Sequence, residues 1–101
     1  MKEKKAKFEY GTVIVTPMVR DKMKTDQAFQ NFVTTCLGRY IKGDWGASSP
    51  DDKFDNNDAV REGKGRIFAA YKRYDADGEE FIWIETESDR ETTIIMFPEE
   101  N

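Results

Sequence analysis

Histidine is absent from this sequence of 101 residues, and cysteine occurs once. Because histidine is the commonest general base and the commonest metal ligand in proteins, its absence removes the usual candidate for either role. The single thiol, Cys36, excludes an internal disulfide and is typical of a reducing compartment, so we expect a cytoplasmic protein. Without a cluster of cysteine and histidine, we predict neither a zinc site nor any other metal or cofactor.

Long apolar runs are also missing. No stretch of 18 apolar residues occurs, so we expect no membrane-spanning helix, and the segment after residue 7 lacks the apolar stretch of a signal peptide. Charged residues make up 36% of the chain and apolar residues 38%, which is typical of a folded soluble domain. We therefore predict one domain over residues 1–101, with 1–7 as a flexible basic tail.

The last third of the sequence predicts three consecutive strands, over residues 66–74, 81–84 and 92–97, because these runs are rich in β-branched and aromatic residues. The Asp-Ala-Asp-Gly sequence at 75–78 and the Ser-Asp-Arg sequence at 88–90 are typical of tight turns. Strands joined by such short turns must be antiparallel neighbours.

Alternation along the middle strand places Ile82, Ile84 and Thr86 on one face, which we expect to pack against helices. Phe81, Trp83, Glu85 and Glu87 then lie on the opposite face, which is either solvated or a binding surface.

Three helices and one further strand are expected before this sheet. Residues 8–16 predict the strand, with 12–16 as its body, and Thr16-Pro17 predicts the start of a short helix. A long amphipathic helix is predicted between residues 25 and 43, where a close contact with the sheet would explain Gly38. Ser49-Pro50 predicts the start of a third, surface helix ending near residue 62. The predicted fold is α+β: a single antiparallel sheet of about four strands, with the elements in the order β-α-(α)-α-β-β-β and the helices packed on one face.

The net charge of −4 conceals an asymmetry along the chain. Residues 75–101 contain ten acidic residues and one arginine, whereas residues 1–74 carry a net positive charge. An acidic surface attracts basic partners and repels nucleic-acid phosphates, so we predict a basic protein partner and not direct nucleic-acid binding, despite Lys72 and Arg73 beside tyrosines. The alternative is a solvated edge that only keeps the protein soluble.

Seven polar or aromatic residues would come together if the third helix crossed the sheet: Asp44, Trp45, Asp52, Asn56, Thr86, Asp89 and Arg90. One interpretation is structural, with Trp45 filling the edge of the core and Asp52 capping a helix. A second is a catalytic carboxylate pair among the three aspartates. A third is partner binding, for which aromatic and arginine side chains are the usual anchors.

Several short motifs together resemble those of a known family. They are GDWG at 43–46, SPDD at 49–52, IWIETESDR at 82–90 and TTI at 92–94. In this combination the sequence resembles a family of small bacterial proteins described as plasmid-related, some labelled as the M subunit of type I restriction enzymes. The resemblance implies a protein carried by a mobile genetic element. It does not imply methyl transfer, because no glycine-rich cofactor loop follows a strand.

We therefore hypothesise a non-enzymatic protein-binding module of a plasmid or phage, acting in a bacterial cytoplasm as an inhibitor of a host defence system such as CRISPR or restriction. The residues expected to bind the partner are Trp45, Tyr71, Glu79, Glu80, Trp83, Glu85, Glu87, Asp89 and Arg90. Two alternatives stay open. One is a small enzyme or ligand-binding domain using the region of Asp44, Asp52 and Arg90, and the other is a homodimeric accessory protein.

Overall fold

A computed structural model describes residues 6–101 of the chain. Most of the expected basic tail, residues 1–5, lies outside the described residues. The elements in chain order are β1 (Thr12–Val15), α1 (Pro17–Thr25), α2 (Gln27–Ile41), α3 (Pro50–Glu62), β2 (Ile67–Asp75), β3 (Gly78–Thr86), β4 (Thr92–Met96) and a short 3₁₀ turn, η1 (Pro98–Glu100). The α+β class and the predicted order of helices and strands are confirmed.

The four strands form one sheet in the order β1-β4-β3-β2. β2, β3 and β4 are antiparallel neighbours as predicted, but β1 runs parallel to β4, so the sheet is mixed and not wholly antiparallel. The prediction was wrong for this pair because no short turn joins β1 to another strand. The chain returns to β1 only after passing through all three helices and two strands, and such a connection allows either direction.

Each helix begins where its capping residues predict. The side-chain oxygens of Thr16, Asp26 and Ser49 each accept a hydrogen bond from the backbone N–H three residues on. Proline occupies the first turn of α1 and of α3, where its missing N–H costs nothing. These caps satisfy backbone donors that the helices leave without partners, and they fix where the helices enter the core.

The core lies between α2 and one face of the sheet. Phe29, Val33, Cys36 and Tyr40 form the buried stripe of α2, at the spacing predicted from the sequence. Burying a large apolar side chain stabilises the fold by about 1.5–3 kcal/mol. The sheet contributes the other half of the core through Ile67, Ala69, Tyr71, Ile82, Ile84 and Ile95. As predicted, Ile82, Ile84 and Thr86 of β3 face the helices.

Gly38 does not have the close contact that the sequence suggested. A Cβ atom built at this position meets nothing within 4 Å. The glycine is therefore not required by packing of the described residues, and the prediction of a close helix–sheet approach at Gly38 was wrong.

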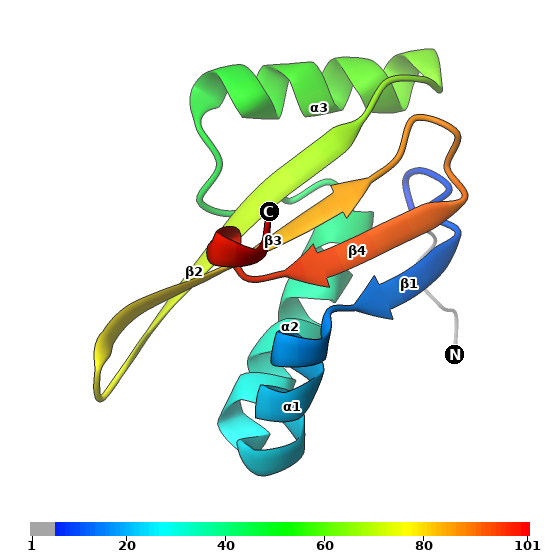
Figure 1. The fold of residues 1–101 in the computed structure, drawn as a ribbon. Helices are drawn as coiled ribbons and strands as arrows, with labels where there is room; N and C mark the ends of the chain where they lie inside the picture. Colours follow the sequence, from blue (N-terminus) through cyan, green and yellow to red (C-terminus); the bar gives the residue numbers. More distant parts are fainter. Residues whose placement is uncertain (1–5) are drawn as a thin grey trace, which may run out of the picture.

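The helices divide between a face and an edge of the sheet (Figure 1). α1 and α2 pack together on one face, while α3 lies along the outer edge of β2. The Asn56 carboxamide of α3 accepts a hydrogen bond from Phe68 N at 3.1 Å and donates one to Phe68 O at 2.6 Å. Ser48 Oγ and Ala47 N pair with the N–H and C=O of Ala70, the next outward-facing residue of this strand. This edge is therefore closed by other parts of the chain.

Candidate functional site

The face of the sheet opposite α1 and α2 is the candidate site, and we call it the open face. Alternation along the strands and the pairing register assign its apolar members: Ile14, Phe68, Phe81, Trp83, Ile94 and Met96. Met96 is buried, but Phe68, Phe81, Trp83 and Ile94 are only partly covered, and Ile14 is 46% exposed. The position of Trp83 on this face agrees with the sequence prediction.

Trp83 lies near the middle of the open face. Its ring packs edge-on against Phe68 of the neighbouring strand, with ring centroids 5.1 Å apart. A hollow of about 260 Å³ is lined by Asp52, Arg66, Phe68, Trp83, Glu85 and Asn101. This volume is below the 300–1,000 Å³ typical of small-molecule pockets and suits one side chain of a partner protein better.

The carboxylates on the open face are paired with basic side chains from β2 and from the residue just before it. Arg66 Nη1 donates to Glu85 Oε2 at 2.7 Å, and Lys72 Nζ lies 3.6 Å from Glu79 Oε2. The acidic strand therefore lies beside a basic strand, and the middle of the open face is close to neutral. The prediction of a continuous acidic surface at Glu79 and Glu85 was therefore wrong. Basic and acidic residues that are separated along the sequence lie side by side in the sheet, and their charges cancel.

Glu80 also has a structural role. Arg73 donates to Glu80 Oε1 at 2.9 Å, and Lys22 of α1 pairs with the other carboxylate oxygen. The Arg73 guanidinium stacks over Phe29 and Phe32 of α2 at 5.3–5.4 Å. These contacts tie β2 and β3 to both helices, so Glu80 is not free for a partner.

Four of the acidic side chains without an ion pair among residues 6–101 lie at the two ends of the open face. Glu87, Asp89 and Glu91 belong to the turn between β3 and β4, and Asp77 to the turn between β2 and β3. Negative charge is therefore present at the rim of the open face.

Two predicted partner-binding aromatics are in the core instead. Trp45 is 4% exposed, packs against Tyr40 with ring centroids 5.6 Å apart, and donates from Nε1 to Asn57 Oδ1. Tyr71 is fully buried and donates from its hydroxyl to Asp44 O at 2.6 Å. The prediction was wrong for both residues, because their rings fill the space between the 43–48 connection and the sheet and cannot reach a partner.

A tight turn makes this arrangement possible. Gly46 has a positive φ of 61°, and a Cβ atom there would lie 2.5 Å from the Tyr71 ring. Only glycine fits both the backbone conformation and the space. The GDWG motif therefore has a packing role in this fold.

Arg90 is a structural residue as well. It has a positive φ of 65°, and its guanidinium donates to the backbone oxygens of Gly65 and Ala59 at 2.5 Å and 3.1 Å. It joins the turn between β3 and β4 to the end of α3. Partner binding predicted for Arg90 would require breaking these bonds.

The polar constellation predicted around Asp44, Asp52 and Arg90 does not converge. Asp44 pairs with Arg39 at 2.8 Å at the end of α2, and this hydrogen bond lowers the pKa of the Asp44 carboxyl. Asp52 lies in the first turn of α3, whereas Arg90 binds Ala59 in its last turns, about 10 Å further along the helix axis. The structure thus removes the geometric basis for a ligand or catalytic site made by these three residues.

Thr86 belongs to a buried hydrogen-bond chain. Its Oγ1 lies 2.7 Å from both Tyr40 Oη and Thr93 Oγ1, and Thr93 donates to Tyr10 O at 2.6 Å. Since Thr93 donates onward, Thr86 is the donor to Thr93. The single hydroxyl proton of Tyr40 then has two acceptors within reach, Thr86 Oγ1 and Ile67 O, the latter at 3.2 Å. Every group in the chain is satisfied, so Thr86 is structural.

Cys36 is a core thiol, buried in the α2 stripe. Burial raises its pKa to about 12, so it stays protonated at neutral pH. A nucleophilic cysteine needs the thiolate, so Cys36 lacks the environment of one.

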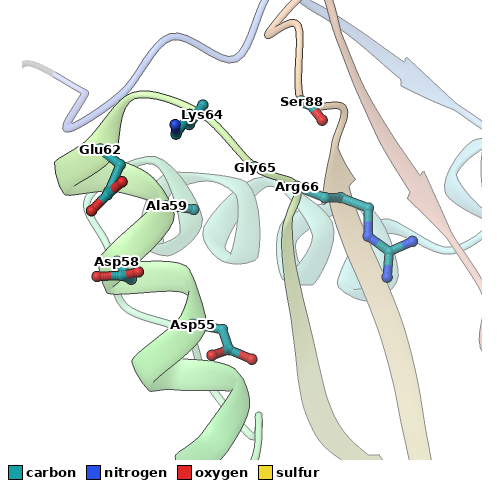
Figure 2. Close-up of a pocket in the computed structure, with 8 residues that line it drawn as sticks. All are labelled: Asp55, Asp58, Ala59, Glu62, Lys64, Gly65, Arg66 and Ser88. Atoms are coloured by element: carbon teal, nitrogen blue, oxygen red, sulfur yellow. The ribbon is translucent and has the colours of Figure 1, made fainter.

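A larger hollow of about 540 Å³ lies between the end of α3, the start of β2 and the turn after β3 (Figure 2). Asp55, Asp58 and Glu62 project from α3, but Figure 2 shows that the Arg66 side chain extends away from the helix, toward the sheet. Asp58 pairs with Arg61 and Arg66 with Glu85. These charges point in different directions and do not converge on a ligand position.

No group of three or more acidic or cysteine side chains among residues 6–101 is arranged to hold a metal ion. No helix within these residues has both the length and the apolar character to cross a membrane.

Comparison of the chain with models of protein families, with curated proteins and with solved structures found no match. The resemblance to the plasmid-related family therefore stays a prediction.

Sequence reasoning missed four members of the open face, namely Ile14, Phe68, Ile94 and Met96. Phe68 was assigned to a strand but not to a face, because its face follows from pairing with Glu85 across the hairpin. Ile14 and Ile94 are partners in the parallel pair of β1 and β4, which no local signal predicted.

Proposed function

We propose that this chain is a non-enzymatic protein-binding module that acts through the open face of its sheet. The observation that carries the proposal is the apolar, aromatic character of a face that none of the three α-helices covers. Within residues 6–101, the η1 turn contacts β3, and Asn101 lines the hollow beside Trp83. On the open face Phe68 and Trp83 pack edge-to-face, and the isoleucine pair Ile14 and Ile94 continues the apolar surface toward β1. A contiguous exposed apolar patch on a soluble protein marks an interaction site.

Charge at the rim favours a basic partner. The ion pairs of Glu79 and Glu85 leave the centre of the face neutral, as protein interfaces commonly are, with charge moved to the periphery. Glu87 and Asp89 at one end would speed association with a positively charged surface.

The resemblance to proteins of mobile genetic elements supports a narrower form of the proposal. In this form the partner is a component of a bacterial defence system such as restriction or CRISPR, and the module inhibits it. Proteins that act on nucleic acids have basic surfaces, which the acidic rim would complement.

The test is an inhibition assay in bacteria that carry a defined restriction or CRISPR system, with plasmid transformation efficiency as the readout. We expect Trp83→Ala to abolish protection of the plasmid, and Glu87→Lys with Asp89→Lys to weaken it. Phe54→Ala is the matched control, because Phe54 is a 68% exposed aromatic on α3, outside the open face.

Thermal melting of each purified variant separates loss of binding from loss of folding. Protection that survives Trp83→Ala in a folded protein would overturn the role of the open face. Absence of protection by the wild-type chain against every system tested would overturn the narrower proposal, while pull-down with the same variants would still test protein binding.

A further inference from the structure

The two edges of the sheet differ in how they are closed. The β2 edge is covered at Phe68 and Ala70 by Asn56 and the 46–48 segment, and the next outward residue is Lys72, a charge of the kind that blocks strand addition. The β1 edge has no such device among residues 6–101. Its strand, Thr12–Val15, contains no charge, no proline and no bulge.

The direction of the backbone groups in β1 follows from its pairing with β4. Thr12 N donates to Glu91 O at 3.0 Å, and Thr16 N donates to Ile95 O at 3.1 Å. Because these groups alternate along a strand, Val13 and Val15 direct their N–H and C=O away from the sheet. Four backbone groups are therefore available at this edge.

Over residues 6–101, the path of the chain leaves the β1 edge uncovered. α1 begins directly after β1 but turns inward, where it contacts α2 and β4. Residues 7–10 lie under the sheet, since Lys7 N donates to Ile41 O and Tyr10 O accepts from Thr93. Figure 1 shows β1 as the outermost strand on this side.

The sequence of this edge is a palindrome. Residues 12–16 read Thr-Val-Ile-Val-Thr, which is the same in both directions about Ile14. A second copy related by a two-fold axis at Ile14 would place Val13 opposite Val15, Thr12 opposite Thr16 and Ile14 opposite itself. The outward N–H and C=O groups of Val13 and Val15 then exchange four hydrogen bonds in antiparallel register.

We propose that β1 pairs with β1 of a second copy of this chain, so that two sheets join into one of eight strands. A homodimer with a two-fold axis needs a self-complementary surface, and an uncharged palindromic strand is one. The pairing also brings two Ile14 side chains together on the open face, where each copy alone leaves one 46% exposed.

The dimer is expected to be reversible. A strand of four residues is about 13 Å long, so the joint is small compared with a standard protein interface. We expect a monomer–dimer equilibrium across about 1 µM to 1 mM protein, measured by sedimentation velocity.

Charge placed at the two-fold axis tests the register. Ile14→Lys sets two like charges opposite each other and should weaken the dimer at least about tenfold, as should Ile14→Glu. Mixing the two variants pairs opposite charges and should restore a dimer that contains one copy of each. Met18→Lys is the control, because Met18 is an equally exposed apolar residue outside β1 and should leave the equilibrium unchanged.

Circular dichroism establishes that each variant is folded before sedimentation. A wild-type protein that stays monomeric at the highest concentration overturns the proposal. This holds even if the β1 edge is then found to bind a strand of a different protein. A dimer that Ile14→Lys does not weaken, or that mixing does not restore, overturns the register. The effect of Trp83→Ala on plasmid protection is measured in a separate assay. Failure of the dimer test therefore leaves the proposed function standing.

Discussion

Asn56 offers the sharpest test of how the β2 edge is closed. It is 2% exposed, and its carboxamide both accepts from Phe68 N and donates to Phe68 O. Replacing it with leucine leaves a buried N–H and a buried C=O without partners. At about 1–3 kcal/mol for each of these two unsatisfied groups, Asn56→Leu should cost about 2–6 kcal/mol of unfolding free energy. That is a large part of the ~5–15 kcal/mol that stabilises a typical domain.

Asn56→Asp adds a dependence on pH. The carboxylate keeps the acceptor for Phe68 N but places negative charge against Phe68 O, which the asparagine approached at 2.6 Å. A protonated carboxyl can donate to that oxygen, so folding raises the pKa of the introduced group above its value in the unfolded chain. The folded state then binds more protons than the unfolded state, and the deficit of the variant relative to wild type shrinks as pH falls.

Urea unfolding followed by circular dichroism measures this difference at neutral pH and at about pH 4. Asn31→Asp is the control, because Asn31 is exposed on α2 and the change there should stay within about 0.5 kcal/mol at either pH. Equal effects of the two substitutions, or a deficit of Asn56→Asp that does not change with pH, would refute the assignment of Asn56 as the closure of this edge.

Three further predictions concern α2 and its ends. Gly38→Ala should raise the unfolding free energy by up to about 1 kcal/mol, measured by urea titration, since a Cβ there meets no neighbour; a loss of stability would contradict this. Cys36 should not react with a thiol reagent until the protein is unfolded in urea, because burial raises its pKa to about 12; fast labelling of the native protein would show that it is accessible. Asp44→Ala should cost no more than about 1 kcal/mol at neutral pH, because the pair with Arg39 is exposed. The folded pKa of Asp44 is lowered, so this cost should disappear as pH falls through that pKa, and a cost that persists in acid would have another origin.

The parts of the fold that were predictable from sequence depend on local signals. Thr16, Asp26 and Ser49 cap their helices because capping uses a backbone N–H three residues away. The turn at 75–78 fixed the register of the hairpin, and that register placed Trp83 on the open face. The parallel pairing of β1 with β4 could not be predicted, since it joins residues that no short connection brings together.

The candidate site was predicted less well because it depends on what is close in space. Counting charge along the chain suggested an acidic surface, but Glu80 lies between Arg73 and Lys22, which come from other elements. Aromatic type alone did not distinguish Trp83, which is on the open face, from Trp45, which fills the core. The distinction is made by the Gly46 turn, which directs Trp45 inward.

The parallel pair also has a consequence for the order of folding. Thr93 and Tyr10, which hydrogen-bond at this junction, are 83 positions apart in the chain, whereas the strands β2, β3 and β4 meet across short turns. Contacts that close a long loop form late, because the chain must lose the conformational entropy of that loop before the contacts can stabilise the fold. We therefore expect the three-strand meander to assemble early and β1 to dock last. By the same reasoning, amide hydrogens of β1 should exchange with solvent faster than those of β3.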